Sequence, residues 1–528
     1  ARRGYVVLAL DLHSHGDSES LSIAELYDGA VGVDGAVQLI ASLPYVDTAR
    51  IGVTGHSSGG TAANMAVEID NSRETPLIAA VLQQAGDWQD DTGGDHSGDY
   101  GSRSVGIIAS THDDFYFGTY DDAGNMLTNP AAFMETDGAK KFLNFNEDGF
   151  AGIAEGGKYY TRDFDGKTAY RVIYRPNMIH PLVAFSTTCV GYAVDFFDTT
   201  LGAPKPLPAS DQIWPIKAVF NSLGVIGLLI FMVSFTLVLL DTPVFSALRS
   251  GEIVQPAPVQ DSGAKAWYWV LLIIGAVFSG ASFLFCMNTV YSKTTNFFVQ
   301  TGPLTIGTWA ALCGIFAIFC SAVFYGAYGK KHGWSARRAG LYLNLEQLWK
   351  TIALAVIVIV VSFGLVFAAH YFFQVDYRMY VVAFKTFGAD KVLIALRYLP
   401  FFLLFYVMNS ISANCFNYNT IGGKNGNILI FAFFNALGAI FVVASQYIYF
   451  YATGYQLYGL TEGQRIGPIW LFPCMVLLFV TPIMSRIIYK RTRNPYIAGL
   501  INAMFIVMIS CSNTTTILGG GELIATTF

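Results

Sequence analysis

The pattern of hydrophobic and polar positions divides the chain into two parts. Up to about residue 211, short apolar runs alternate with polar loops. Beyond residue 215, long apolar stretches follow one another almost to the end of the chain. Short apolar runs are typical of buried strands in a parallel sheet, whereas long ones are typical of membrane-spanning helices. We therefore predict an α/β domain at 1–203, a Pro-rich linker at 204–215 and an all-α polytopic membrane domain at 216–528.

Strands and helices alternate in the first part. Buried strands are expected at 5–11, 51–54, 77–82 and 105–109, and a hairpin is expected at 159–164 and 168–174. Residues 22–43 have the spacing of an amphipathic helix, and a second helix is expected from residue 60. This alternation predicts a mostly parallel sheet with helices packed on it.

Eight stretches in the second part are long enough to cross a bilayer. They lie near 216–240, 267–291, 304–328, 351–373, 392–411, 428–451, 467–489 and 494–517. Arg397 and Pro400 interrupt the fifth. The polar residues expected at membrane depth are His370, Arg397, Asn409, Asn414, Asn435, Gln446 and Asn502. For these residues we favour hydrogen bonding between helices, or side chains that extend toward an interface, over a direct functional role.

Composition supports this division. Hydrophobic residues make up 53% of the 528 residues and charged residues only 13%, which is too apolar for an ordinary soluble protein. Residues 1–211 hold 29 acidic and 13 basic side chains, whereas the rest hold 8 and 19. Six of the seven cysteines are in the apolar part, so no disulfide framework is predicted. Nothing in the basic loops indicates a nucleic-acid partner.

The basic residues also predict an orientation. The loops after the first, third, fifth and seventh spans hold twelve Lys and Arg, and the other loops hold five. The twelve include Arg486, whose side chain is expected to extend outward from the end of its span. Because Lys and Arg accumulate on the cytoplasmic side, we expect an integral protein of the cell membrane whose α/β domain is extracytoplasmic. A signal or anchor segment is expected to precede the residues given.

The candidate chemistry centres on Gly55-His56-Ser57-Ser58-Gly59, which lies between a predicted strand and a predicted helix. A serine between two glycines at such a turn is typical of a nucleophile held at a helix N-terminus. We expect both glycines to be needed because side chains would clash in so sharp a turn. The N–H of Ser58 is a candidate oxyanion donor. The alternative is a glycine-rich turn that only packs strand on helix.

A wider resemblance surrounds this motif. Gly4-Tyr5-Val6-Val7 through Asp11, followed by His15-Gly16-Asp17-Ser18, resembles the fourth-strand region of α/β-hydrolases, most closely the dienelactone-hydrolase and prolyl-oligopeptidase-like branches. The similarity covers residues 4–200. It implies that the three leading strands, and the loop with the second oxyanion donor, are absent from this sequence.

The resemblance also implies the partners of Ser57. The family places an acid after its seventh strand and a histidine after its eighth, which correspond to Asp113 and His180 here, in the chain order Ser, Asp, His. Asp114 is the rival acid, and His56 is a candidate pocket residue. Such a triad activates the serine hydroxyl through a histidine that the carboxylate orients.

We therefore expect a membrane-bound serine hydrolase that cleaves an ester, thioester or amide of a small-molecule or lipid acyl substrate, without a cofactor. The alternatives are a transporter or receptor with a hydrolase-like binding domain, and a membrane acyltransferase. His13-Ser14-His15-Gly16-Asp17 also matches the opening of the metallo-β-lactamase zinc signature, but Ser18 stands where a further histidine belongs. No metal is expected, and the oligomeric state is not predicted.

Overall fold

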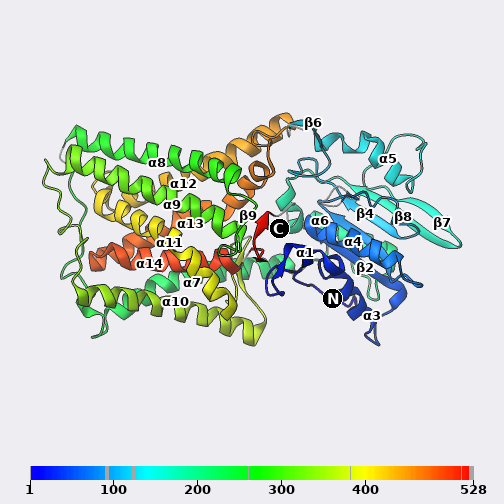
Figure 1. Ribbon diagram of the computed structural model, residues 1–528, viewed down its shortest axis with the longest axis horizontal. Helices are drawn as coiled ribbons and strands as arrows, with labels where there is room; N and C mark the ends of the chain where they lie inside the picture. Colours follow the sequence, from blue (N-terminus) through cyan, green and yellow to red (C-terminus); the bar gives the residue numbers. More distant parts are fainter. Residues whose placement is uncertain are drawn as a thin grey trace. The chain divides into compact units, whose positions relative to one another are not determined.

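The structure is a computed structural model that describes residues 2–89, 94–121, 125–259, 261–380, 382–512 and 514–522. The chain forms two compact units (Figure 1). Unit 1 is Ala1–Pro215 together with Ser445–Ile466 and Thr515–Phe528, and unit 2 is Ile216–Ala444 together with Gly467–Thr514. The last six residues of the predicted membrane domain, 523–528, lie outside the described residues.

A five-stranded sheet forms the centre of unit 1. Its strands are β2 (Ile51–His56), β3 (Ile78–Gln84), β4 (Ser104–Ile108), β7 (Tyr160–Phe164) and β8 (Lys167–Tyr174). They lie in the order β2-β3-β4-β8-β7, with the first four parallel and β7 antiparallel to β8. Three of the four predicted single strands and the predicted hairpin are thus present, in a mixed sheet that is mostly parallel.

Helices cover both faces of this sheet because successive side chains of a strand point to opposite faces. On β3, Val81 belongs to the apolar core that contains residues of α4 (Ser58–Asn71), whereas Ala80 and Leu82 belong to the core that contains residues of α6 (Thr187–Leu201). The other elements of this part are β1 (Leu21–Ser22), α1 (Ile23–Leu26), α2 (Asp28–Val31), α3 (Val33–Ala41), η1 (Thr48–Arg50), β5 (Thr119–Tyr120), β6 (Met126–Thr128), η2 (Pro130–Glu135), α5 (Asp137–Leu143) and η3 (His180–Phe185).

Two predictions for the first 43 residues are wrong. Residues 5–11 form no strand, and Val6 and Val7 are 44% and 67% exposed. An apolar run becomes a buried strand only beside a partner strand, and no described strand pairs with this run. The helix predicted at 22–43 is divided into α1, α2 and α3, since Gly29 and Gly32 have φ values of +58° and +92°.

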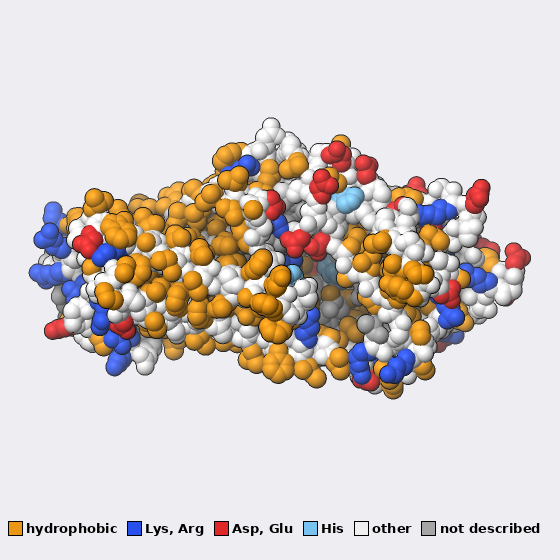
Figure 2. Space-filling view, turned by 90° about the horizontal axis from the view of Figure 1, so that it is seen from below, with side chains coloured by type: hydrophobic (Ala, Val, Ile, Leu, Met, Phe, Trp, Pro, Cys, Tyr) orange, Lys and Arg blue, Asp and Glu red, His pale blue; other side chains and the backbone are white. Residues whose placement is uncertain are grey.

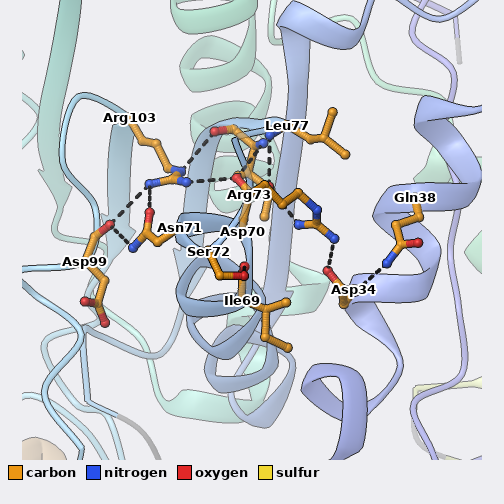
Figure 3. Close-up of polar contacts among 11 residues, drawn as sticks. Asp34, Gln38, Ile69, Asp70, Asn71, Ser72, Arg73, Leu77, Asp99 and Arg103 are labelled. Atoms are coloured by element: carbon orange, nitrogen blue, oxygen red, sulfur yellow. Dashed lines mark hydrogen bonds and ion pairs between the residues drawn. The ribbon is translucent and has the colours of Figure 1, made fainter. Parts of the chain in front are cut away.

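A buried polar network ties the end of α4 to the sheet (Figure 3). The carboxylate of Asp70 accepts from Arg103 Nη2 and Arg73 Nη1, both at 2.8 Å, and from the amides of Leu77 and Ile78 at 2.9 and 3.0 Å. Burial raises the pKa of Asp70, but the hydrogen bond from Arg103 and those from the two amides and Arg73 outweigh burial and hold this pKa below its usual value. Asp70 is therefore a charged anchor for the segment that enters β3.

Unit 2 is built from long apolar helices. They are α7 (Trp214–Leu240), α8 (Ser262–Thr289), α9 (Thr301–Phe324), α10 (Leu345–Phe373), α11 (Ala389–Ile411), α12 (Gly423–Thr453), α13 (Glu462–Thr492) and α14 (Pro495–Ser512). All eight are long and apolar enough to cross a membrane, counting the π-helical turns η5 (Tyr325–Gly329) and η6 (Ser412–Phe416) that extend α9 and α11. The chain is an integral membrane protein by this criterion. Shorter elements of unit 2 are η4 (Ser246–Leu248), β9 (Lys293–Thr294), β10 (Tyr377–Met379) and β11 (Val382–Phe384), whereas β12 (Ile517–Leu518) and β13 (Gly521–Glu522) belong to unit 1.

The surfaces of these helices suit a bilayer. Hydrophobic side chains cover most of their outer face in Figure 2, and Lys and Arg side chains gather at one end of the bundle. Helix α14 is the most buried of the eight and packs against α11 and α10. The eighth span is shorter than predicted: α14 ends at Ser512, and Ile517 instead pairs with Leu21 of β1 in unit 1.

Polar residues within unit 2 mostly bond to other helices, as expected. The amide of Asn409 donates to Asn435, and the amide of Asn502 donates to Thr481 O. The expectation for Arg486 is wrong, because its side chain is buried rather than reaching outward. It donates to Asn414 Oδ1 (2.8 Å) and Asn427 Oδ1 (3.0 Å), since a buried guanidinium needs polar partners.

Candidate active site

Ser57 lies at the turn between β2 and α4. Its backbone has φ 56° and ψ −122°, a combination that side chains make costly. Its amide donates to Gln84 O of the neighbouring strand β3 (2.9 Å), and its carbonyl accepts from the amide of Gly60 (2.7 Å). The Ser57 side chain makes no capping hydrogen bond to α4. A strained serine at a strand-to-helix turn has the backbone geometry of a nucleophile elbow.

The two glycines of the motif have different roles. A Cβ built on Gly55 would lie 2.0 Å from the backbone carbon of Gly59, so no side chain fits at position 55. A Cβ built on Gly59 would have no atom within 4 Å. The expectation that a side chain would clash at both positions is therefore wrong for Gly59. The backbone of Gly59 lies close to Gly55, but the space where a Gly59 side chain would point is open.

Asp113 follows β4 and His180 follows β8. Because β2, β4 and β8 run parallel, their carboxyl ends lie at one edge of the sheet. His180 Nδ1 lies 2.9 Å from Asp113 Oδ1 and 3.0 Å from Oδ2. The same carboxylate accepts from the amides of Phe115 (3.0 Å) and Tyr116 (2.9 Å) and from Ser110 Oγ (3.1 Å).

These contacts determine the charge of Asp113 and the tautomer of His180. Complete burial raises the pKa of Asp113, but the neighbouring His180 and the two backbone amides outweigh burial and hold the pKa below its usual value. An ionised carboxylate can only accept hydrogen bonds, so Nδ1 of His180 is the donor. In the neutral imidazole, Nε2 then remains as the acceptor, which is the state that a general base requires.

Asp114 occupies a different position from its neighbour. Its Oδ2 accepts from the backbone amide of His180 (3.2 Å), and its Oδ1 has no hydrogen-bond partner among the described residues. Burial, followed by the charge of Asp113, raises the pKa of Asp114 well above its usual value. The surroundings of the rival acid thus favour its neutral form, and its carboxyl group contacts the backbone of His180 rather than the ring.

His56 connects the serine turn to the histidine. Its ring lies 4.7 Å from the ring of His180 between centroids, and its Nε2 donates to His180 O (3.0 Å). Burial, with the nearby His180, lowers the pKa of His56 to about 4, so this imidazole is neutral near pH 7. Phe115 and Tyr116 pack on the His180 ring at 5.0 and 5.9 Å.

The site is nearly closed. Ser57 is 7% exposed, His180 is 4% exposed and the side chain of Asp113 is fully buried. His180 contacts Asp113, Asp114 and His56 directly, whereas no hydrogen bond joins the Ser57 side chain to His180 in the part of the chain that the structure describes. Ser57 follows His56 in the chain, and Ser58 begins α4 directly after it.

Sequence reasoning missed part of this site, which comes from residue 445 onward. Within unit 1, Gln456 Nε2 donates to the backbone carbonyl of Asp114 (2.6 Å). The ring of His112 lies 4.4 Å from Tyr451 and 5.4 Å from Phe450. The loop that carries the candidate acids is therefore held by the connection between the sixth and seventh apolar helices. No local motif marks these residues.

Groups of the His13–Asp17 loop form hydrogen bonds within the loop and with other parts of unit 1. His15 Nδ1 bonds to His13 O (2.8 Å), and His15 Nε2 lies 3.0 Å from Thr515 Oγ1. The amide of Asp17 donates to Asp11. Among the described residues, no group of three or more His, Cys, Asp or Glu is arranged to hold a metal ion.

Comparison of the chain with protein-family models, with curated proteins and with solved structures found no match. Function is therefore inferred from the geometry of unit 1.

Proposed function

We propose that unit 1 is a serine hydrolase that acts through an acyl-enzyme. The observation that carries this proposal is the strained Ser57 at the edge of the sheet where His180 is hydrogen-bonded to a buried, ionised Asp113. Strain of this kind persists only where the surrounding structure enforces it, and it is concentrated at functional sites.

In the first half of the reaction, Ser57 Oγ attacks the acyl carbonyl while its proton moves to His180 Nε2. The imidazolium that forms keeps its Nδ1–H on Asp113, whose negative charge stabilises it. The carbonyl oxygen becomes an oxyanion, and the N–H of Ser58 is the proposed donor to it. His180 then protonates the leaving group as the carbon–oxygen, carbon–sulfur or carbon–nitrogen bond breaks.

In the second half, water attacks the acyl-enzyme. His180 accepts a proton from this water, and the tetrahedral intermediate collapses to release the acid and restore the Ser57 hydroxyl. If an alcohol or amine takes the place of water, the same residues perform acyl transfer. The acyltransferase alternative therefore differs only in the acceptor.

A lipidic acyl substrate is favoured. The chain carries eight helices that suit a bilayer, and a protein held in a membrane meets lipids at high local concentration. The aromatic rings of Phe115 and Tyr116 beside His180 provide apolar surface. The runner-up class is a transporter or receptor whose hydrolase-like unit only binds, and it is favoured by the number of spans, which exceeds what an anchor needs.

We also propose that the hydrolase unit is extracytoplasmic in a cell membrane. With Arg486 buried and removed from the count, the loops after the odd-numbered spans still hold eleven basic residues against five. By the positive-inside rule, the side with eleven basic residues is still expected to face the cytoplasm. Protease applied to intact cells should release the hydrolase unit; protection of this unit until lysis would show the opposite orientation.

Hydrolysis of short-chain p-nitrophenyl esters by the full-length protein tests the proposed reaction. We expect turnover by the wild type and its loss in Ser57→Ala. Ester hydrolysis that persists unchanged in Ser57→Ala, or that is absent from folded wild-type protein, would refute the proposal and favour the binding alternative. Analysis of products with added alcohol or amine separates hydrolase from acyltransferase.

A further inference from the structure

Unit 2 contains a cavity between α8, α9, α11 and α12. The space between its walls is about 840 Å³, part of which is open to the surroundings. Most of the wall is leucine, alanine and phenylalanine, and no Asp, Glu, Lys, Arg or His among the described residues lines it. Every helix that contributes to the wall is long and apolar enough to cross a membrane. A charged ligand group would lose its hydration here without gaining a counter-ion.

One part of the wall is polar, and its hydrogen bonds have a fixed direction. Asn435 Nδ2 donates to Leu478 O (2.6 Å), so Asn435 must present its Oδ1 as an acceptor. Asn409 Nδ2 donates to this oxygen. The remaining acceptor, Asn409 Oδ1, receives no hydrogen bond from any described residue. Both asparagines line the cavity.

The backbone beside these asparagines is irregular but braced. Helix α11 continues into the π-helical turn η6, and such wide turns occur frequently at functional sites. Ser412 and Phe416 of η6 line the cavity. Ala413 O and Asn414 Oδ1 of the same turn accept hydrogen bonds from the buried Arg486. The hydrogen bonds from Arg486 therefore fix the η6 turn, which forms part of the polar wall, and keep it from moving into the cavity.

We propose that this cavity binds one neutral single-chain lipid, whose hydrocarbon chain lies against the aromatic and aliphatic walls of α8 and α9 and whose hydroxyl group donates to Asn409 Oδ1. The apolar walls account for the chain, and the absence of charged side chains among the described wall residues accounts for the neutral headgroup. The acceptor accounts for the hydroxyl, because Asn409 is a mostly buried residue that lines the cavity, and its Oδ1 can accept a hydrogen bond there. This site does not depend on the proposed hydrolase activity.

The test uses the full-length protein in phosphatidylcholine nanodiscs and a 1-O-alkylglycerol that carries a diazirine in its chain. Its ether bond is not a substrate for an acyl hydrolase. After irradiation, we expect saturable crosslinks in α8 and α9 around Cys313. Gly275→Phe on α8 should reduce this labelling at least tenfold, since Gly275 lines the cavity and a Cβ there has open space.

Gly364→Phe is the matched control. Gly364 is also a membrane-helix glycine with nothing within 4 Å of a built Cβ, but it is exposed on α10. Labelling should be unchanged in this variant. Asn409→Leu should weaken labelling by the alkylglycerol about fivefold, the value of one hydrogen bond, and leave labelling by its di-O-methyl ether unchanged.

Equal labelling of Gly275→Phe and Gly364→Phe would overturn the proposal, because it would mean that lipid only coats the helices. An equal effect of Asn409→Leu on both probes would overturn the hydroxyl contact. If Gly275→Phe fails to fold, alkylation of Cys313 in the unmodified protein decides: the alkylglycerol should slow it saturably, and an unchanged rate at saturating probe would refute the site.

Discussion

The two adjacent acids, Asp113 and Asp114, give a matched pair of substitutions that separates the proposed triad from its rival. In Asp113→Asn, the amide oxygen is expected to take the place of Oδ1, where the amides of Phe115 and Tyr116 donate. The amide NH₂ then faces Nδ1 of His180. Nδ1 lies 2.9 Å from Oδ1 and 3.0 Å from Oδ2, so an NH₂ in the place of Oδ2 donates to Nδ1 in competition with the original contact. When it does, the imidazole proton lies on Nε2, which blocks the action of this atom as a base.

The expected effect of Asp113→Asn is large. Losing both the correct tautomer and the charge that stabilises the imidazolium costs about 10⁴-fold in rate in triads of this kind, which is roughly 5.5 kcal/mol of barrier. Asp114→Asn should change the rate less than about threefold. Burial and Asp113 raise the pKa of Asp114 and so favour its neutral form. An amide there resembles that form and can still accept a hydrogen bond from the amide of His180.

The assay is the second-order rate of labelling by a fluorophosphonate probe, measured on full-length protein near pH 7. Equal losses in the two variants, or a greater loss in Asp114→Asn, would refute the assignment of Asp113 as the orienting acid. Stability provides a second readout. A buried acid with a raised pKa lowers stability as pH rises above the unfolded value of about 4, so Asp114→Asn should unfold at a higher temperature than the wild type at pH 7 and at a similar temperature at pH 3.

Other residues of unit 1 give further expectations. Asp70→Asn should destabilise unit 1 by about 3–5 kcal/mol, because it leaves the guanidinium of Arg103 buried without its carboxylate. Since the folded pKa of Asp70 is depressed, the stability that Asp70 contributes is present above about pH 4 and is lost as pH falls through the folded pKa. A variant with wild-type thermal stability at pH 7 would contradict the role of Asp70. Gly55→Ala should abolish ester hydrolysis while Gly59→Ala preserves it, and similar activities would show that the turn has room for a side chain at position 55. Gln456→Ala should slow probe labelling about tenfold by releasing the loop that carries Asp113, and an unchanged rate would show that this hydrogen bond does not position the acid.

Local sequence predicted much of unit 1. The β2–Ser57–α4 turn and the β7–β8 hairpin follow from short apolar runs bounded by glycine and polar residues, which are local signals. The resemblance placed Asp113 and His180 after two expected strands, which the structure contains as β4 and β8, and a hydrogen bond joins the two side chains. The chain order alone could not distinguish Asp113 from Asp114, since that difference depends on which carboxylate reaches the His180 ring.

The errors have a common physical cause, which is that the deciding partner lies far away in the chain. Residues 5–11 have the composition of a buried strand, but strand formation needs a neighbouring strand. Arg486 near a helix end suggested an exposed side chain, but Asn414 and Asn427 on other helices bind it. Likewise, Gln456 follows an apolar helix and bonds to a residue 342 positions earlier, a contact that no local pattern encodes.

The proposed function depends above all on Ser57 being the nucleophile. This assignment is tested by reaction with a fluorophosphonate, followed by mass spectrometry of the peptide that contains Ser57. We expect a single covalent adduct on Ser57 in the full-length wild type, none on the adjacent Ser58, and none anywhere on this peptide in Ser57→Ala. An adduct on Ser58, or no adduct on folded wild-type protein under conditions that label a known serine hydrolase, would contradict the assignment.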